Sequence, residues 1–243
     1  MKKQFVCTVC GYNMVDRYPQ KCPFCGAGRE NYLTAAEVSR HHRVIETPVT
    51  DRVSMLKSHP ALGFEHAAYR LDTGNGSVLI DCPATFDQTL AGIDRIMYTH
   101  NHFLGAGNLY RDHFKAELNI HLRDAGHDLC RGYVFDNLFV DNFTDNGIEA
   151  VHINGHTQGF TIYRHRDCLF VCDYVFYNGA RAKFNPYGPV QTTRQGGTRL
   201  YQLLRTWDIR KVCGFDYVAD FSAWWDKFEE MLSSDVILAR HEQ

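Results

Sequence analysis

Two Cys-x-x-Cys pairs near the start of the chain constrain its fold more than any other feature. Cys7 and Cys10 form the first pair, and Cys22 and Cys25 form the second. A glycine follows each pair, and a residue without a Cβ lets backbone amides approach the sulfurs there. Four thiolates at this spacing suit one tetrahedral ion, either zinc or iron. Some thirty residues bury too little apolar surface to fold alone, so the sequence predicts an N-terminal module held together by metal.

The remaining composition is that of an ordinary folded protein. The chain has 243 residues, of which 44% are hydrophobic, enough for one large domain beside a small module. Its formal net charge of −2 offers no basic footprint for nucleic acid or a membrane surface, so neither partner is expected. We also find no apolar run typical of a membrane span or an export signal. Four of the nine cysteines have metal spacing and the others are scattered, which predicts a reducing, cytoplasmic location and buried, inert thiols for the rest.

After the module, the sequence predicts a short helix and then a large mixed domain. Thr34 and Glu37 have the spacing of a capping box, which indicates a helix start. We therefore divide the chain into a metal module at 1–33, a linker helix at 34–43 and a large domain at 44–243. Strand-like apolar runs alternate in that domain with helical periodicity. The strands are expected at 77–81, 95–100, 118–122, 148–153, 159–163, 168–172 and 211–214, and the helices at 105–115, 123–131, 198–206 and 221–232.

Histidines and aspartates follow several of the expected strands. His100 and His102 leave one strand at positions i and i+2, so their side chains point the same way and can bind one ion. His156 follows a glycine in a later loop, and Asp173 closes a separate strand. Asp81 ends a strand upstream of both. Imidazole and carboxylate ligands suit zinc or iron.

The N-terminal stretch resembles the rubredoxin-like module of rubrerythrins. The points of match are the segments CTVCGY and CPFCGA, at residues 7–12 and 22–27. The resemblance implies iron in the cysteine cage. Zinc ribbons share the bare cysteine pattern, so zinc is the alternative.

The order of the later motifs resembles the metallo-β-lactamase superfamily. A strand ending in Asp81 precedes Thr-His-x-His, Gly-His-Thr-x-Gly and Cys-Asp-x-x-Phe. The resemblance covers most of the large domain and implies an α+β fold with a four-layer αββα sandwich. It also implies that His100, His102 and His156 bind a first metal ion and that Asp173 is shared with a second. Asp81 is then expected to orient the histidine loop without binding metal.

The second metal site of that superfamily is missing from this sequence. The family motif continues Thr-His-x-His-x-Asp-His, whereas Leu104 and Gly105 take the places of the aspartate and the last histidine. Phe215 stands where the family has a further histidine, and Asp216 or Tyr217 are candidates to fill that space. We therefore expect a single iron or zinc ion at the His/Asp site. Because the missing aspartate orients the attacking water in hydrolytic relatives, hydrolysis is expected to be weak.

Three functions are compatible with these motifs. The first is a mononuclear iron oxidoreductase with the rubredoxin-like centre as its one-electron donor, since persulfide dioxygenases of the superfamily use one iron. The second is a mononuclear zinc hydrolase of glyoxalase-II or lactonase type, which the motifs Asp173-x-x-Phe176 and Gly179-x-Arg181 favour. The third is a non-catalytic metal-binding or redox-sensing protein. Iron at both sites would indicate the first function, zinc the second, and an empty histidine cluster the third.

The expected ligands and partners follow from the same region. A Pro/Gly-rich segment over 184–197 is predicted either to cover the pocket as a lid or to be a solvated loop. Arg181, Lys183 and Arg194 lie in or beside it and favour a small anionic substrate. A redox partner protein would fit electron transfer. The linker helix spans only about 15 Å, so a homodimer that exchanges its modules is an alternative to contact within one chain.

Overall fold

The computed structural model describes residues 3–90 and 92–241. The chain divides into two compact units, Met1–Val140 and Asp141–Gln243. The cysteine module and the strands that lead to His100 therefore belong to the same unit, while His156 and Asp173 belong to the other.

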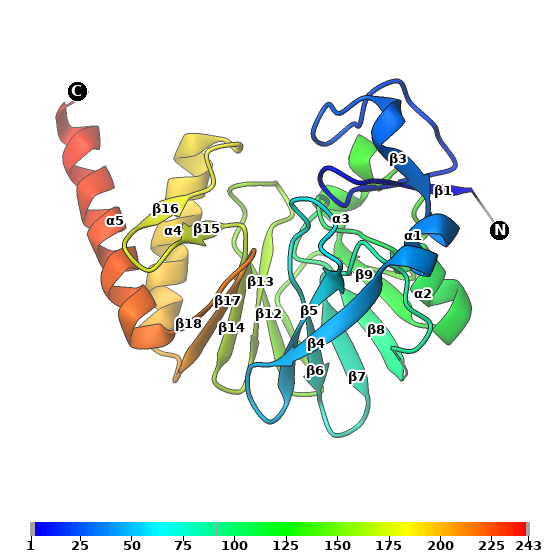
Figure 1. Cartoon of the computed structure of the whole chain (residues 1–243). Helices are drawn as coiled ribbons and strands as arrows, with labels where there is room; N and C mark the ends of the chain where they lie inside the picture. Colours follow the sequence, from blue (N-terminus) through cyan, green and yellow to red (C-terminus); the bar gives the residue numbers. More distant parts are fainter. Residues whose placement is uncertain (1–2, 91, 242–243) are drawn as a thin grey trace. The chain divides into compact units, whose positions relative to one another are not determined.

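The cysteine module is a small antiparallel sheet followed by a helix (Figure 1). The helix α1 (Ala35–His41) has the predicted capping box, in which the Thr34 side chain accepts from the Glu37 amide and the Glu37 side chain accepts from the Thr34 amide. The sheet has the order β2-β1-β3, with β1 at Gln4–Cys7, β2 at Asn13–Val15, the 3₁₀ turn η1 at Arg29–Asn31 and β3 at Tyr32–Thr34.

The module is packed firmly onto the rest of the first unit. The Tyr12 hydroxyl donates to the Leu129 carbonyl at 2.7 Å, and the Asn13 amide donates to the Ala84 carbonyl at 3.0 Å. The Leu129 side chain also joins the apolar cluster that contains three of the four module cysteines. The module thus borrows part of its core from the larger body, as its small size requires.

The large sheet of the first unit has the order β10-β9-β8-β7-β6-β5-β4. Its strands run antiparallel from β4 to β7 and parallel from β7 to β10. The parallel strands bring their carboxyl ends to one edge, where Asp81 and the histidine loop follow. The elements are β4 (Arg43–Pro48), β5 (Val53–His59), β6 (Ala68–Asp72), β7 (Ser77–Ile80), β8 (Ile93–Met97), α2 (Gly107–Phe114), β9 (Glu117–His121), α3 (Leu122–Ala125), η2 (Asp128–Cys130) and β10 (Asn137–Phe139).

One helix of this unit was predicted too long. The helix expected over 123–131 ends at Ala125, and a separate 3₁₀ turn follows after Gly126. Glycine has a low helix propensity, and the His127 side chain accepts from the Leu129 amide, so a new turn begins there.

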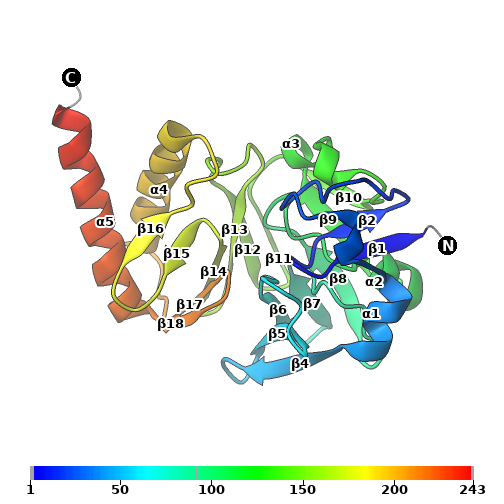
Figure 2. The same cartoon turned by 45° about the horizontal axis from the view of Figure 1, so that its top comes forward.

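The second unit contains one mixed sheet with helices on one face (Figures 1 and 2). The sheet has the order β11-β12-β13-β14-β17-β18. Its β14–β17 pair is parallel, and the other four described pairs of this sheet are antiparallel. Helices α4 and α5 pack on each other, and the β15–β16 hairpin packs against α5. The elements are β11 (Phe143–Asp145), β12 (Ile148–His152), β13 (Thr161–His165), β14 (Cys168–Cys172), β15 (Val175–Tyr177), β16 (Ala182–Phe184), α4 (Val190–Leu204), β17 (Lys211–Gly214), β18 (Val218–Asp220) and α5 (Phe221–His241).

Helix α4 begins well before the expected residue 198 and takes in much of the segment predicted as a lid or loop. A Cβ at Gly196 would overlap the Tyr174 hydroxyl, and one at Gly197 would overlap the Phe184 ring. These glycines therefore let the helix pack closely on the hairpin. The glycine-rich composition reflects helix packing in this case, and the loop interpretation is wrong over most of that segment.

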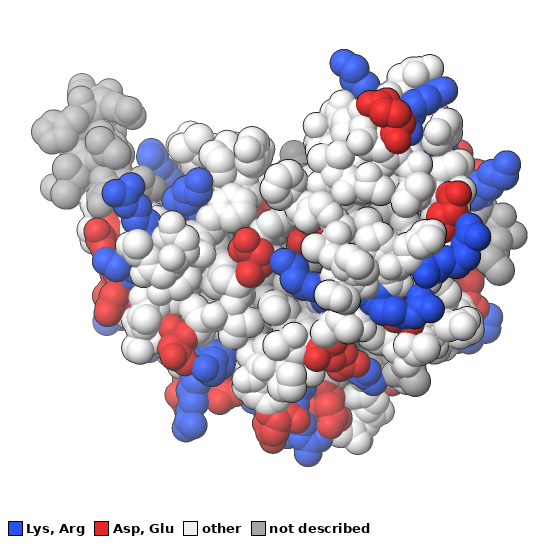
Figure 3. All heavy atoms as spheres, in the orientation of Figure 1, with Lys and Arg blue, Asp and Glu red and all other residues white. Residues whose placement is uncertain are grey.

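The surface carries charges of both signs. Figure 3 shows lysine and arginine interspersed with aspartate and glutamate over the face that is drawn. Within the described residues, no helix combines the length and the apolar character that a membrane span needs.

Candidate metal centres

Two groups of side chains among the described residues have the composition of metal sites. The first group is Cys7, Cys10, Cys22 and Cys25. The second group is His100 and His102, which belong to the first unit, with His156 and Asp173, which belong to the second unit.

Each cysteine pair lies in the same kind of tight turn. The Gly11 amide donates to the Cys7 carbonyl at 2.8 Å, and the Gly26 amide donates to the Cys22 carbonyl at 2.9 Å. Both glycines have a positive φ, +76° and +77°, which side chains rarely adopt. The two turns therefore present their cysteines in equivalent ways, and this explains the glycine after each pair.

The sulfur positions fit a tetrahedral ion. The Sγ atoms of Cys7 and Cys25 are 3.7 Å apart, and those of Cys10 and Cys22 are 3.8 Å apart. All four candidate ligand atoms lie within 4.8 Å of one another. An ion with metal–sulfur bonds of about 2.3 Å would place its sulfurs about 3.8 Å apart. The cage therefore has the dimensions of a four-thiolate site.

Close packing of the thiols perturbs their ionisation. Hydrogen bonds with Cys10 and Cys22 lower the pKa of Cys7, while the hydrogen bonds with Cys22 and Cys7 raise the pKa of Cys10. Four thiolates in this space need a cation to balance their charge, so metal binding and deprotonation are coupled.

The histidine loop is held by a chain of hydrogen bonds that begins at Asp81. Its carboxylate accepts from the Thr99 amide at 2.9 Å and from the Thr99 hydroxyl at 2.9 Å. The hydroxyl oxygen in turn lies 2.9 Å from Nδ1 of His100. Because the hydroxyl gives its proton to Asp81, it accepts from Nδ1–H, and Nε2 keeps the lone pair that a metal requires. Asp81 thus acts on His100 through Thr99, as an orienting residue would.

Aromatic rings surround the histidine pair. The His100 and His102 rings lie 4.5 Å apart, and Phe103 lies 4.9 Å from His100. Phe103 stacks on His66 at 4.2 Å, and the ring of this buried histidine also contacts the Cys82 carbonyl at 2.9 Å. His66 and Phe103 had no motif in the sequence that could mark them.

The cysteine module reaches the same loop through Phe24. This residue lies between the two cysteines of the second pair, and its ring centroid is 5.4 Å from that of His102 and 6.2 Å from that of Phe103. The contact is formed within one chain, so the module reaches the histidine loop without a second copy. An aromatic residue inside a Cys-x-x-Cys turn carries no sequence signal for this role.

Leu104 and Gly105, which take the places of the first two missing second-site ligands, have structural roles. The Leu104 side chain is fully buried in the main apolar cluster of the first unit. Gly105 has φ of +48°, and a Cβ there would overlap the carbonyl oxygens of Cys82 and Pro83. A histidine would therefore not fit at position 105.

The third missing position is likewise filled by structural residues. The Phe215 ring packs 6.0 Å from that of Phe176, and Asp216 is exposed. The Tyr217 hydroxyl donates to the Val175 carbonyl at 2.9 Å and accepts from the indole N–H of Trp224 at 3.1 Å. Tyr217 therefore ties the hairpin to helix α5.

In the second unit, Asn185 holds His156 and Asp173 together. All three side chains are buried, with 4% of each residue exposed. Nε2 of His156 lies 3.4 Å from the Asp173 carboxylate. The Asn185 amide donates to that carboxylate at 2.9 Å and lies 3.3 Å from the histidine nitrogen. Sequence reasoning missed Asn185, because it comes from the hairpin end and not from a metal motif.

The short connection between β16 and α4 covers this histidine. A Cβ at Gly188 would lie 2.8 Å from the His156 backbone, so only glycine allows such a close approach. The Tyr187 amide donates to the Asn185 side chain at 2.9 Å, while the Tyr187 ring is exposed. The part of the predicted lid that remains a loop is therefore packed onto His156.

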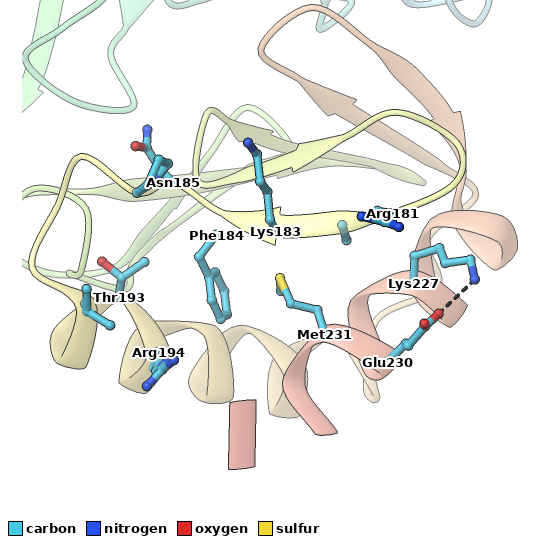
Figure 4. A pocket seen from close by; sticks show the side chains of 12 residues that line it. Arg181, Lys183, Phe184, Asn185, Thr193, Arg194, Lys227, Glu230 and Met231 are labelled. Carbon is cyan, nitrogen blue, oxygen red and sulfur yellow. Dashed lines mark hydrogen bonds and ion pairs between the residues drawn. The ribbon is translucent and has the colours of Figure 1, made fainter. Parts of the chain in front are cut away.

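A pocket of about 430 Å³ lies between the β15–β16 hairpin and helices α4 and α5 (Figure 4). Asn185 lines it, and Figure 4 places Arg181 near the Lys227–Glu230 ion pair, at the opposite end from Asn185. Basic side chains outnumber acidic ones among the lining residues. The charged members are Arg181, Lys183, Arg194, Lys227 and Glu230.

The remaining cysteines are buried, as predicted. Burial raises the pKa of Cys82 and Cys213 well above the usual range, and it raises that of Cys130 to about 12. Such thiols are poor nucleophiles and poor metal ligands at neutral pH.

Comparison with known families identifies the N-terminal module. Residues 5–32 match the family model described as rubrerythrin, rubredoxin-like domain. This confirms the resemblance drawn from the two cysteine turns. Comparison of the chain with curated proteins gives no significant match.

Solved structures identify the fold of most of the chain. A metallo-β-lactamase from Pontibacter korlensis has a TM-score of 0.64 at 17% identity, covering 79% of this chain and 98% of that one. VMB-1 has a TM-score of 0.65 at 16% identity, with coverage of 79% and 98%. TTHA1623, solved in a di-iron-bound form, has a TM-score of 0.55 at 20% identity, with coverage of 67% and 93%.

At these identities the likeness establishes the fold and confirms the predicted α+β class. The chain is a metal-binding protein of metallo-β-lactamase fold, with an N-terminal rubredoxin-like cysteine site and with candidate His and Asp ligands in both units.

Proposed function

We propose that the protein is a mononuclear metal oxidoreductase. In this proposal His100, His102, His156 and Asp173 bind one ion, and an iron ion at the cysteine cage supplies it with single electrons. Three imidazoles and one carboxylate are donors that suit iron with open coordination positions. The order of the motifs and the metallo-β-lactamase fold support a single site for the four ligands.

The observation that carries a redox role is the contact between the cysteine cage and the histidine loop. Phe24, which stands between two cage cysteines, touches His102 directly. A four-cysteine iron centre changes its ligands little when it gains or loses one electron, so a short distance to the acceptor is the main requirement. A cysteine cage with a purely structural role would not need to lie next to the histidine loop.

The protein residues around the histidine site have three roles in this proposal. Asp81 and Thr99 keep the proton of His100 on Nδ1, so that Nε2 binds the metal. Asn185 holds Asp173 beside His156. Leu104 takes the motif position of the carboxylate that orients water in hydrolytic relatives, and its side chain is buried in the apolar core, so no carboxylate is available from that position and hydrolysis is disfavoured.

We further propose a small anionic substrate or cosubstrate. The pocket beside Asn185 has lining residues that include four cations and one carboxylate, and its volume of about 430 Å³ fits a small molecule. A reduced thiol-derived anion is the class that agrees best with an iron oxidoreductase. A redox partner protein that reduces the cage completes the proposed cycle.

The test begins with metal content. Protein purified without oxygen should contain two metal ions per chain, with iron at the cage, and should consume oxygen in the presence of a reductant and a small thiol-derived anion. It should turn over esters, thioesters and lactones slowly. Zinc at both sites with fast turnover of that panel would instead establish a mononuclear zinc hydrolase, and an empty histidine site would indicate a metal-binding or sensing protein without catalysis.

A further inference from the structure

We infer that Phe24 is a positioning residue that makes metal binding at the histidine site depend on metal binding at the cysteine cage. A filled cage would hold the Phe24 ring against His102, and His102 would then be preoriented for its own ion. The inference uses the proposed role of His102 as a ligand. It does not depend on electron transfer, so it holds for zinc as well as for iron.

The position of Phe24 is set by the second cysteine turn. The turn is closed by the Gly26 amide on the Cys22 carbonyl at 2.9 Å and by the Cys22 amide on the Ala27 carbonyl at 2.7 Å. Three of the cysteines belong to the buried cluster that the module forms with Leu129, and Cys25 is exposed. An ion that joins all four sulfurs is therefore the main cross-link that fixes this turn.

From this turn the Phe24 ring spans the space between the module and the histidine loop. It stacks on Tyr12 at 6.1 Å with an interplanar angle of 18°, and it meets the His102 ring edge to face at 5.4 Å and 62°. It also contacts Phe103 at 6.2 Å. Aromatic pairs at such distances contribute to stability beyond the area they bury. A movement of the second cysteine turn would therefore change the contact between Phe24 and His102.

Of the two histidines in the loop, His102 is the one that such a contact can influence more. His100 is fully buried and is tied through Thr99 to Asp81, whereas His102 is half-buried. Its ring is contacted by those of Phe24, His100 and Phe103. Loss of the Phe24 ring would widen the range of orientations of His102, and outer contacts of this kind change metal affinity. Coupling between binding sites is reciprocal, so an ion at the histidine site would also stabilise the cage.

The experiment uses the full chain and measures the Zn²⁺ dissociation constant of the histidine site by chelator competition. Elemental analysis of the same samples counts the ion in the cysteine cage. Phe24→Leu should weaken Zn²⁺ binding roughly two- to tenfold, the range expected for one aromatic contact. Phe24→Tyr keeps the ring and should restore the parent affinity. Phe64→Leu is the matched control, because this exposed ring also adjoins the module, where the Phe64 amide donates to the Val9 carbonyl.

Emptying the cage should act through the same residue. Cys22→Ser should weaken Zn²⁺ binding at the histidine site in the parent but add little in a Phe24→Leu background. Equal affinity of Phe24→Leu and parent, or a Cys22→Ser effect that is the same in both backgrounds, would overturn the inference.

The effect of the histidine site on the cysteine cage can be measured in variants that keep both sets of ligands. Zn²⁺ at the histidine site should slow chelator extraction of the cage ion in the parent, and this slowing should shrink in Phe24→Leu; an undiminished effect would also overturn the inference. A chain with this coupling but without electron transfer would contradict the proposed function alone.

Discussion

At the residue scale, the position of the proton on His100 depends on the hydrogen-bond chain from Asp81 through Thr99. Asp81→Asn would place an amide where the Thr99 hydroxyl now donates. That amide would donate to the hydroxyl, which would then donate to Nδ1 of His100 and leave the imidazole proton on Nε2. We expect metal affinity at the histidine site to fall about 10- to 100-fold, with no loss of metal from the cysteine cage.

The control for this change is another buried aspartate that bonds backbone amides. Asp87 accepts from the Val44 and Thr89 amides, away from the histidine loop. Asp87→Asn should lower stability without changing metal affinity. The orienting role of Asp81 would be wrong if both variants bound Zn²⁺ as the parent does.

Asn185 offers a second test at this scale. Asn185→Ala removes the donor that holds Asp173 beside His156. We expect affinity at the histidine site to fall about tenfold, because the buried carboxylate loses its orienting partner. Asn178→Ala is the control, since that side chain caps only the hairpin turn at Ala180 and Arg181. Calorimetric titration of metal into both variants measures the difference, and equal affinities would contradict the role.

Residue-level prediction from the sequence is possible where the chemistry demands a fixed spacing. Cys-x-x-Cys-Gly and His-x-His are imposed by bond lengths and by backbone geometry, so they can be read directly. Phe24 and Asn185 act by touching a ligand from another segment. Many residue types satisfy such contacts at many positions, and the sequence contains no spacing that marks them.

At the element scale, the histidine loop depends on a tight passage after β8. Gly105→Ala would force a side chain against the Cys82 and Pro83 carbonyls at a φ of +48°. We expect the free energy of unfolding to fall by about 2–4 kcal/mol, because both the contact and the backbone conformation are unfavourable. Gly74→Ala has a similar positive φ with open space around the Cβ, and it should cost less. Urea denaturation measures both, and equal losses would contradict the steric explanation.

Asp136 joins helix α2 to strand β9 of the first unit. Its carboxylate accepts three bonds from Arg111 of α2 and one from the Leu118 amide of β9. The Arg111 guanidinium holds the pKa of this carboxyl below its usual range. The resulting stabilisation is present above the unfolded-state pKa and is lost as the pH falls through the lower, folded-state pKa.

We therefore expect Asp136→Asn to lower the free energy of unfolding by about 1 kcal/mol at pH 7, since the pair is only partly buried. The difference from the parent should shrink as the pH falls into the acidic range. Asp112→Asn, an exposed neighbour of Arg111, should have little effect at any pH. Denaturation at several pH values measures this, and a difference that grew towards acid pH would contradict the assignment.

The prediction of helices from the sequence failed at glycines, because a glycine can either end a helix or lie inside one that packs closely on a neighbour. Gly196 and Gly197 read as loop residues, yet they lie inside α4 because the helix approaches Tyr174 and Phe184 closely. Gly126, in contrast, divides a segment whose periodicity alone predicted one continuous helix. The sequence does not state how near a neighbouring element will come, and that distance decides between these cases.

At the scale of the whole molecule, the sequence identified both metal motifs and the metallo-β-lactamase fold, because four motifs in a fixed order are far more specific than any one of them. The division into units at Val140 had no such signal. The contact between the module and the histidine loop could not be predicted either, because the length of a linker gives the distance it can span but not its direction. The domain boundaries at residues 33 and 43 remain predictions.

The proposed transfer of electrons from the cysteine cage to the histidine site has a direct kinetic test. The most direct measurement reduces the cage iron without oxygen, adds oxygen with a thiol-derived anion, and follows the visible absorption of the cage in the parent and in His156→Ala. Faster reoxidation in the parent is the expected result, because only the parent keeps the complete acceptor site. Equal reoxidation rates in the two proteins would mean that the cage and the histidine site are electronically independent, and the cage would then be a structural element.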